Sequence, residues 1–276
     1  MAITAADVNK LRQMTGAGMM DCKNALVEAD GDFDAAIDIL RKKGQKVAAK
    51  RSDRDANEGF VYAQTDSNNT FGAIAMINCE SDFVGKTDDF VNFAKSIVEL
   101  AIIKKPKTAD ELFALELNGR LVSDAVVDLT GKTGERIIIS HYEFIEAAFV
   151  SAYNHNGNRL ATIVGFNKTA DKLETVGHEI AMQIAAMSPI AIDQNNVSQA
   201  TIDHELELAR EITRQEGKPE DMVEKIAQGK LNKFLKENTL VNQEFIRDNK
   251  KTVGQYIKET NSELSCVDFK RLQLGA

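Results

Sequence analysis

Four carboxylates within ten residues are the first group of side chains in this sequence that could perform chemistry. They are Glu80, Asp82, Asp88 and Asp89. Clustered carboxylate oxygens can bind hard cations such as Mg²⁺ or Ca²⁺, but this spacing fits no calcium loop. Asp88 and Asp89 fall in the expected first turn of a helix, where the helix dipole favours negative charge. We therefore expect no metal ligand here, and only Asp82 keeps a functional interpretation.

Asp82 stands beside an aromatic ring, Phe83, on a short connection between an expected strand and an expected helix. The apolar run at 73–77 predicts the strand, and Thr87 begins the helical pattern. Such connections usually lie at the surface, where function is often placed. An ordinary turn with the ring tucked into the core is the simpler alternative. We interpret the stretch as a contact tip aimed at another protein.

Two further motifs give weaker signals. Gly131-Lys132-Thr133 looks like the end of a phosphate-binding loop, but Val126 stands where such a loop needs a glycine. We expect a polar turn before a strand instead. The histidines show no paired spacing, so His178 and His204 are expected to be surface or hydrogen-bonded structural histidines, while His155, in a turn, is more open to a role.

Composition narrows the class of protein. The chain has 276 residues, of which 43% are hydrophobic and 28% charged, as in an ordinary soluble globular protein. The net charge of -8 argues against direct nucleic-acid binding, which usually requires a basic face. The 3 cysteines are widely spaced, which favours a reducing, cytoplasmic location over a disulfide framework or a zinc site. The sequence shows no secretory signal and no run long enough for a membrane span, so no membrane association is expected.

The apolar pattern predicts an α+β chain built from several units. A helical module precedes a polar linker, a core of two α+β subdomains with antiparallel strands follows, and a helical hairpin protrudes from the second subdomain. The expected bounds are 1–50 for the module, 51–58 for the linker, 59–148 for the first subdomain, 149–197 with 239–276 for the second, and 198–238 for the arm. Two helices of about 20 residues would make this coiled-coil arm roughly 30 Å long.

The helical module is expected to contain three short helices, which together resemble a ubiquitin-associated bundle. Thr4 and Asp32 are candidate N-caps, and Gly44 is expected to end the third helix. Met19 and Met20 are adjacent and cannot both face one way on a helix. At least one should therefore be exposed, which suits an adaptable contact surface.

Within the core, a hairpin followed by a helix is expected twice. Period-2 segments joined by turn residues predict the strands, and 3.6-residue periodicity predicts the helices. The expected strands lie at 59–65, 70–78, 135–147, 149–153, 159–166 and 264–272, and the expected helices at 87–103, 108–117, 119–129, 170–187 and 252–259.

Several segments resemble the family of bacterial translation elongation factor Ts, in matching order over nearly the whole chain. The longest are Leu11–Lys23 and Asn78–Val84, where the family more often has Thr at position 81. Ile180–Ala186 and Thr252–Gln255 resemble two further family segments.

This resemblance implies a nucleotide-exchange factor for the GTPase elongation factor Tu, with no catalytic residue or cofactor of its own. Such a factor binds the GDP-bound and nucleotide-free partner, promotes release of GDP and Mg²⁺, and leaves when GTP enters. By the resemblance, Phe83 inserts near the partner's Mg²⁺ site and Asp82 disturbs the hydration of that ion. The implied Mg²⁺-dislocating residues are Ser81, Asp82, Phe83 and Val84, and the other implied partner contacts are Arg12, Met19, Met20, Lys23 and His155.

Two other classes of function stay open at this point. The carboxylates at 80–89 could serve a metal-dependent hydrolase, although no nucleophile or histidine partner is recognisable. The module at 1–50 alone could serve a ubiquitin-associated adaptor, which would leave the core and the arm without a role.

Overall fold

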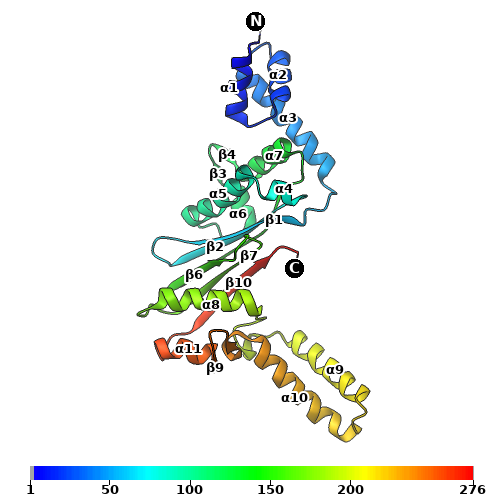
Figure 1. The fold of residues 1–276 in the computed structure, drawn as a ribbon, viewed down its shortest axis with the longest axis vertical. Coiled ribbons are helices and arrows are strands. Elements are labelled where there is room, and N and C mark those ends of the chain that lie inside the picture. Colours follow the sequence, from blue (N-terminus) through cyan, green and yellow to red (C-terminus); the bar gives the residue numbers. More distant parts are fainter. Residues whose placement is uncertain (1–2, 276) are drawn as a thin grey trace.

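The computed structural model describes residues 3–275 as an elongated α+β molecule (Figure 1). A helical bundle lies at one end, layered sheets and helices form the middle, and a helical arm projects from the other end. The helices are α1 (Ala5–Thr15), α2 (Met19–Glu28), α3 (Phe33–Arg51), α4 (Asp82–Gly85), α5 (Asp88–Lys104), α6 (Ala109–Phe113), α7 (Val122–Thr133), α8 (Leu173–Met187), α9 (Gln199–Gln215), α10 (Glu220–Asn238) and α11 (Val253–Thr260). The strands are β1 (Glu58–Thr65), β2 (Phe71–Cys79), β3 (Glu116–Leu117), β4 (Arg120–Leu121), β5 (Ile138–Glu146), β6 (Phe149–Asn154), β7 (Leu160–Phe166), β8 (Glu244–Phe245), β9 (Asp248–Thr252) and β10 (Cys266–Gln273).

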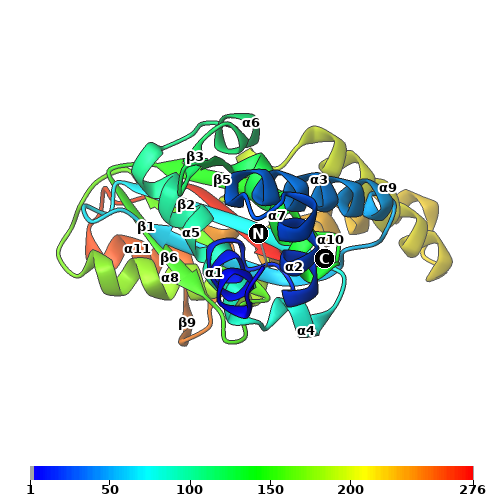
Figure 2. The same ribbon diagram turned by 90° about the horizontal axis from the view of Figure 1, so that it is seen from above.

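The core consists of two antiparallel three-stranded sheets packed face to face. Their strand orders are β1-β2-β5 and β10-β7-β6. Helices α5 to α7 cover the outer face of the first sheet, and α8 and α11 cover the outer face of the second (Figures 1 and 2). All nine residues of β2 are buried, because this central strand has a helical layer on one face and the second sheet on the other. The expected α+β class with antiparallel strands is confirmed.

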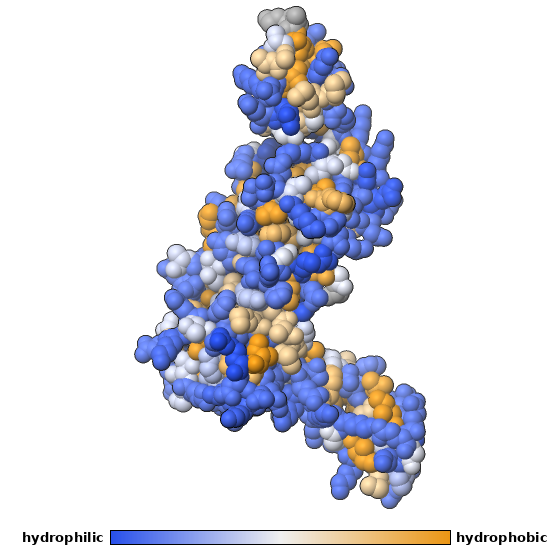
Figure 3. Space-filling view, viewed as in Figure 1, coloured by the Kyte–Doolittle hydropathy of each residue, from blue (hydrophilic) through white to orange (hydrophobic). Residues whose placement is uncertain are grey.

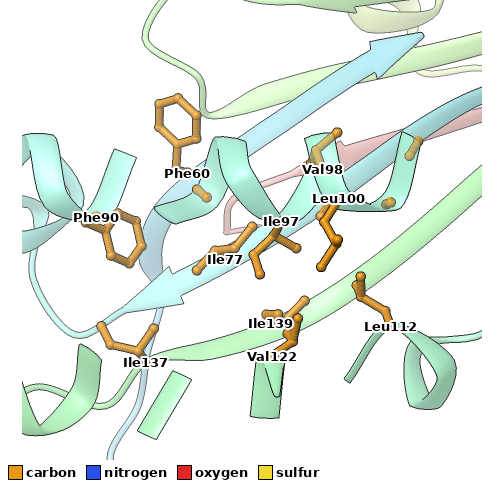
Figure 4. Packing of buried hydrophobic residues seen from close by; sticks show 14 of the residues in the cluster. Phe60, Ile77, Phe90, Ile97, Val98, Leu100, Leu112, Val122, Ile137 and Ile139 are labelled. Carbon is orange, nitrogen blue, oxygen red and sulfur yellow. The ribbon is translucent and has the colours of Figure 1, made fainter. Parts of the chain in front are cut away.

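Successive side chains of β1 point to opposite faces of the first sheet, so this sheet contributes residues to two hydrophobic clusters. Phe60 packs toward α5, and Val61 packs toward the second sheet, as the two-residue period of a strand requires. Figure 4 shows the first of these clusters, in which side chains from α5 meet those of β2 and β5. The large residues there include Ile77, Phe90 and Ile97, all of them fully buried.

The expected helix caps of the N-terminal bundle are present. The Asp7 amide donates to Thr4 Oγ1 over 3.2 Å, and the Thr4 amide donates to Asp7 Oδ2 over 3.0 Å, which completes a capping box. Asp32 accepts from the Ala35 amide over 2.9 Å at the start of α3. A small buried cluster joins the three helices, and its members are Val8, Leu11, Cys22, Ala25, Leu26 and Ala36. The likeness of this bundle to a ubiquitin-associated module stays a prediction.

Gly44 does not end the third helix, contrary to expectation. It is buried in the middle of α3, which continues to Arg51 and so includes the first residue of the expected linker. Gly44 faces Gly131 of α7, where an added Cβ would lie only 2.7 Å from the Gly44 Cα. The glycine therefore serves the close approach of two helices, and no cap is formed at this position.

Gly131-Lys132-Thr133 forms the last turn of α7, so the expected polar turn at these residues is wrong. The chain turns instead at Gly134, which adopts the left-handed conformation with φ 71°. The helices expected at 108–117 and 119–129 are also shifted, because the small hairpin β3–β4 lies between α6 and α7. Its turn is Asn118-Gly119, with φ of 54° and 77°, a strong two-residue hairpin signal that the helical interpretation missed.

The C-terminal half holds the arm. Ser198 caps α9, and α9 and α10 pack along a narrow seam of small and aliphatic residues (Ala209, Thr213, Val223, Ala227 and Leu231). Figure 3 shows hydrophobic side chains gathered on the arm, and Leu208, Ile212 and Met222 are its large exposed ones. The short hairpin β8–β9 follows the arm and was not expected. Within residues 3–275 the helices are too short or too polar to cross a bilayer.

Candidate partner-contact site

The stretch after β2 forms a one-turn helix with its aromatic ring in solvent. Ser81 caps α4 by accepting the Val84 amide on Oγ over 3.3 Å. The Phe83 side chain that follows is 82% exposed. A ring tucked into the core, the simpler alternative, is therefore excluded. The exposed ring is available to another molecule without any rearrangement of the core.

Asp82 lies beside the ring and carries a negative charge at neutral pH. Lys86 Nζ donates to Asp82 Oδ2 over 2.6 Å, one turn further along the chain. This hydrogen bond lowers the pKa of the exposed Asp82 carboxyl below its ordinary value. The tip thus presents an apolar ring next to a carboxylate whose Lys86 partner is itself exposed, and an exposed ion pair of this kind contributes little stability.

Two carboxylates hold the base of the tip. Glu135, just after α7, accepts the Ser81 amide over 2.9 Å and the Ser81 hydroxyl over 2.6 Å. Glu80 accepts the Arg136 amide over 2.7 Å and Arg51 Nη1 over 2.8 Å. We refer to the paired segments Glu80–Ser81 and Glu135–Arg136 as the carboxylate clamp. Sequence reasoning missed this clamp.

The floor beneath the tip is tightly packed and chemically inert. Gly85 is buried, and a Cβ added there would lie 3.3 Å from Cys79 Sγ. Gly59 in the adjacent strand has φ 148°, and a Cβ there would lie 2.1 Å from the Ile77 carbonyl oxygen. Burial raises the pKa of the Cys79 thiol to about 12, so it stays protonated at neutral pH. The tightly packed residues beneath the tip therefore leave little room for a side chain larger than glycine at positions 59 and 85.

Three of the four carboxylates at 80–89 are engaged in ion pairs. Glu80 pairs with Arg51, Asp82 with Lys86, and Asp89 with Lys132 over 2.6 Å. As expected, Asp88 and Asp89 lie in the first turn of α5. Across residues 3–275, no three His, Cys, Asp or Glu side chains gather in a way that could hold a metal ion.

The candidate contacts of the N-terminal bundle lie on its surface. Met19 is 55% exposed and Met20 63% exposed, so the expectation that at least one faces solvent is confirmed for both. Arg12 and Lys23 are also exposed. In Figure 1, α2 lies above α4 along the long axis of the molecule.

His155 lies in the exposed β6–β7 turn, with an aromatic neighbour that sequence reasoning missed. Tyr153 Oη lies 2.8 Å from His155 Nδ1, and the same ring packs edge-on against His178 of α8 with centroids 5.5 Å apart. His178 is exposed, as expected, and so is His204. An ion pair between Arg159 and Glu58 ties this turn to the end of the sheet from which the tip emerges. The tip and the His155 turn therefore lie at the same edge of the core.

Comparison with known proteins identifies the family. The family model described as "Elongation factor TS" matches residues 80–276. Proteins named "Elongation factor Ts" from Christiangramia forsetii and Flavobacterium psychrophilum are each 50% identical over 273 residues, covering 99% of both chains. A protein of the same name from Amoebophilus asiaticus is 50% identical over 277 residues, covering 100% of both chains. This chain belongs to the elongation factor Ts family.

Proposed function

We propose that this protein is the guanine-nucleotide exchange factor for the GTPase elongation factor Tu in polypeptide elongation. It binds the GDP-bound partner, promotes release of GDP and Mg²⁺, holds the nucleotide-free partner, and leaves when GTP enters. The observation that carries the proposal is Phe83, exposed beside Asp82 on a clamped one-turn helix, in a chain of this family. The family match leaves the metal-dependent hydrolase and the ubiquitin-associated adaptor without support.

Exchange requires differential affinity for two states of the partner. The factor must bind the empty GTPase more tightly than the nucleotide-bound one, and the same coupling free energy makes nucleotide rebinding release the factor. Burial of one phenylalanine side chain contributes about 1.5–3 kcal/mol. That is roughly one to two decades in an equilibrium constant, too little to offset a bound nucleotide and its Mg²⁺. Contacts away from the tip must supply the rest.

Each tip residue has its own part in this proposal. Phe83 enters the partner near its Mg²⁺ site, and the Asp82 carboxylate disturbs the hydration of the ion. Ser81 and Val84 orient the pair, since Ser81 caps α4 and the half-buried Val84 packs against the cluster under α5.

The remaining contacts lie on the N-terminal bundle and on the second sheet. Arg12 and Lys23 provide charge, Met19 and Met20 provide adaptable apolar surface, and His155 extends the contact to the β6–β7 turn. The protein acts in the cytoplasm on this GTPase without a cofactor, a metal site or direct nucleic-acid contact. It performs no bond-breaking step.

The division into a module at 1–50, a linker at 51–58, core subdomains at 59–148 and 149–197 with 239–276, and an arm at 198–238 belongs to the same proposal. Separate buried clusters in the N-terminal bundle, under α5 and under α8 support it.

The test is stopped-flow release of a fluorescent GDP from elongation factor Tu. Phe83→Ala should slow GDP release at saturating factor by roughly tenfold to 100-fold, because burial of the ring in the partner contributes that much to the binding equilibrium. Asp82→Ala should slow it as well, and both variants should keep their thermal stability since both side chains are exposed.

Ile103→Ala is the matched control. Ile103 is 72% exposed near the end of α5, so this substitution also removes an exposed apolar side chain but should leave release unchanged. Unaltered rates in both tip variants would overturn the role of the tip. A wild-type protein that fails to accelerate release would overturn the function.

A further inference from the structure

We propose that Glu135 is a positioning residue for the tip, and that the carboxylate clamp aims Phe83 at the partner. This inference rests on the proposed exchange function. Glu135 accepts its hydrogen bonds from Ser81, and it acts on Phe83 through that residue.

Helix α4 cannot fix its own direction. It is a single turn of four residues, and one turn of helix is unstable alone because nucleation orders several residues for one hydrogen bond. Phe83 at 82% exposure also lacks packing of its own. The direction of the ring is therefore set by the backbone at its N-cap and by the floor below.

Glu135 holds that N-cap by two charge-assisted hydrogen bonds. Its two oxygens accept separately from the Ser81 amide over 2.9 Å and the Ser81 hydroxyl over 2.6 Å. Hydrogen bonds to an ionised acceptor are shorter and stronger than neutral ones, and two of them fix orientation as well as distance. The same hydroxyl oxygen accepts the Val84 amide, so one side chain connects Glu135 to the first turn of α4.

The second half of the clamp links the tip to the N-terminal bundle. Glu80 accepts the Arg136 amide, so each segment supplies a carboxylate to the backbone of the other. Glu80 also binds Arg51, the last residue of α3. The end of the long helix that begins in the bundle is thereby connected to the residue that precedes Ser81.

The position of Glu135 should thus affect the rate at which the bound factor acts more than the affinity with which it docks. Displacing a reacting or inserting group by about 1 Å can cost on the order of 100-fold in rate. The bundle and the His155 turn are untouched by a change at Glu135, so docking through them persists.

The experiment measures GDP release over a range of factor concentrations for a set of variants. Glu135→Ala should lower the saturating rate by roughly tenfold to 100-fold while changing the half-saturating concentration less than threefold. Glu135→Gln should restore most of the rate, because its amide oxygen can accept the Ser81 amide and its NH₂ can donate to the hydroxyl. Glu146→Gln, which loses an exposed ion pair with Lys107 at the other end of β5, is the matched control and should behave as wild type.

A double variant separates positioning from direct contact. If Glu135 acts through the ring, Glu135→Ala should add less than twofold to the defect of Phe83→Ala. Full additivity of the two defects would overturn the inference, as would a wild-type saturating rate for Glu135→Ala.

Hydrogen exchange on the free protein gives a second measurement, independent of the partner. Glu135→Ala should increase amide exchange of Ser81 and Val84 at least tenfold and leave amides of β7 unchanged. Unchanged protection at both amides would overturn the inference even if exchange activity fell. If Phe83→Ala loses activity and Glu135→Ala has no effect, the proposed exchange function is supported and only the positioning role of Glu135 is overturned.

Discussion

Single carboxylates fix both ends of the central strand β2. At its start, Asp66 accepts the amides of Thr70 and Phe71 over 2.7 and 3.1 Å and the ammonium of Lys105 over 3.0 Å. At its end, Glu135 holds Ser81. Acidic and small polar residues favour such turns because their oxygens can replace backbone partners. The local half of this arrangement is readable from the sequence, since Asp66 lies within five residues of its backbone donors.

Asp66 provides a pH-dependent prediction. Burial by itself raises the pKa of the Asp66 carboxyl, but the hydrogen bonds from Lys105, Thr70 and Phe71 lower it to about 2. The stabilisation is therefore fully present above the unfolded-state pKa near 4 and is lost as the pH falls from there through 2. Asp66→Asn should lower the free energy of unfolding by about 1–2 kcal/mol at pH 7, after allowance for solvent screening.

Urea unfolding between pH 2 and pH 7 checks this prediction. The difference between wild type and Asp66→Asn should shrink toward the acidic end, and Asp55→Asn, at an exposed position before β1, is the control. A difference that stays constant over the whole range would contradict the assignment.

At the scale of elements, the contact between α3 and α7 decides how the N-terminal bundle sits on the core. Gly44 and Gly131 allow the two backbones to approach closely, and Lys132 at the end of α7 lies against Gly16 of the bundle. Beside them is a cavity of about 260 Å³, lined by residues of α1, α3 and α7, including Met14, Ile37 and Asp128. The bundle is thus seated through a narrow glycine contact and a polar rim.

A pair of glycine substitutions tests this contact. Alanine normally stabilises a helix interior by about 0.5–1 kcal/mol over glycine. Gly229→Ala in α10 should show that gain, because an added Cβ there meets no other atom within 4 Å. Gly131→Ala should instead destabilise by about 1–3 kcal/mol, because its Cβ meets the Gly44 backbone at 2.7 Å. Equal effects of the two substitutions on thermal unfolding would show that the helix contact is loose.

Elements with a local signal could be predicted from the sequence. The two hairpins follow from period-2 strands and turn residues, and the helix starts at Thr4, Asp32 and Ser198 follow from capping side chains. Gly44 could not be placed, since its partner lies 87 residues away and the same residue type serves caps and close packing.

The residues of the candidate site likewise divide into those with a local sequence signal and those that only the fold brings together. The tip at 81–84 could be located because a carboxylate, a ring and an N-cap adjoin a strand end. Glu135 could not be found, since it lies 54 residues from Ser81 and has no motif of its own in the sequence. The contact between Tyr153 and His178 could not be predicted for the same reason, because the fold of a strand and a helix brings these two residues together.

For the whole molecule, length is the property that matters to the proposed function. The N-terminal bundle, the tip and the His155 turn are spread along an elongated body, and the last two are tied to the same sheet edge by the Arg159–Glu58 pair. A partner that touches all three must extend over much of that body. Binding free energy gathered at distant contacts can then support distortion near the tip, where a single ring contributes too little.

The crossing at the root of the arm has a further consequence for how the chain tolerates change. The Ile190 amide donates to the Asn238 carbonyl oxygen over 2.9 Å, and the Leu240 amide donates to that of Ala191 over 2.9 Å. The chain segments that enter and leave the arm are thus hydrogen-bonded to each other at its base. We therefore expect that α9 and α10 can be deleted without unfolding the core. Segments whose ends meet on a stable body can be exchanged or deleted with little effect on that body.

Replacement of residues 198–237 by a linker of about six glycine and serine residues keeps Asn238 and should therefore preserve cooperative unfolding of the core and hydrogen-exchange protection of β7. Collapse of that protection would show that the arm is needed for folding. Retention would mean that the tip and its sheet fold independently of the arm.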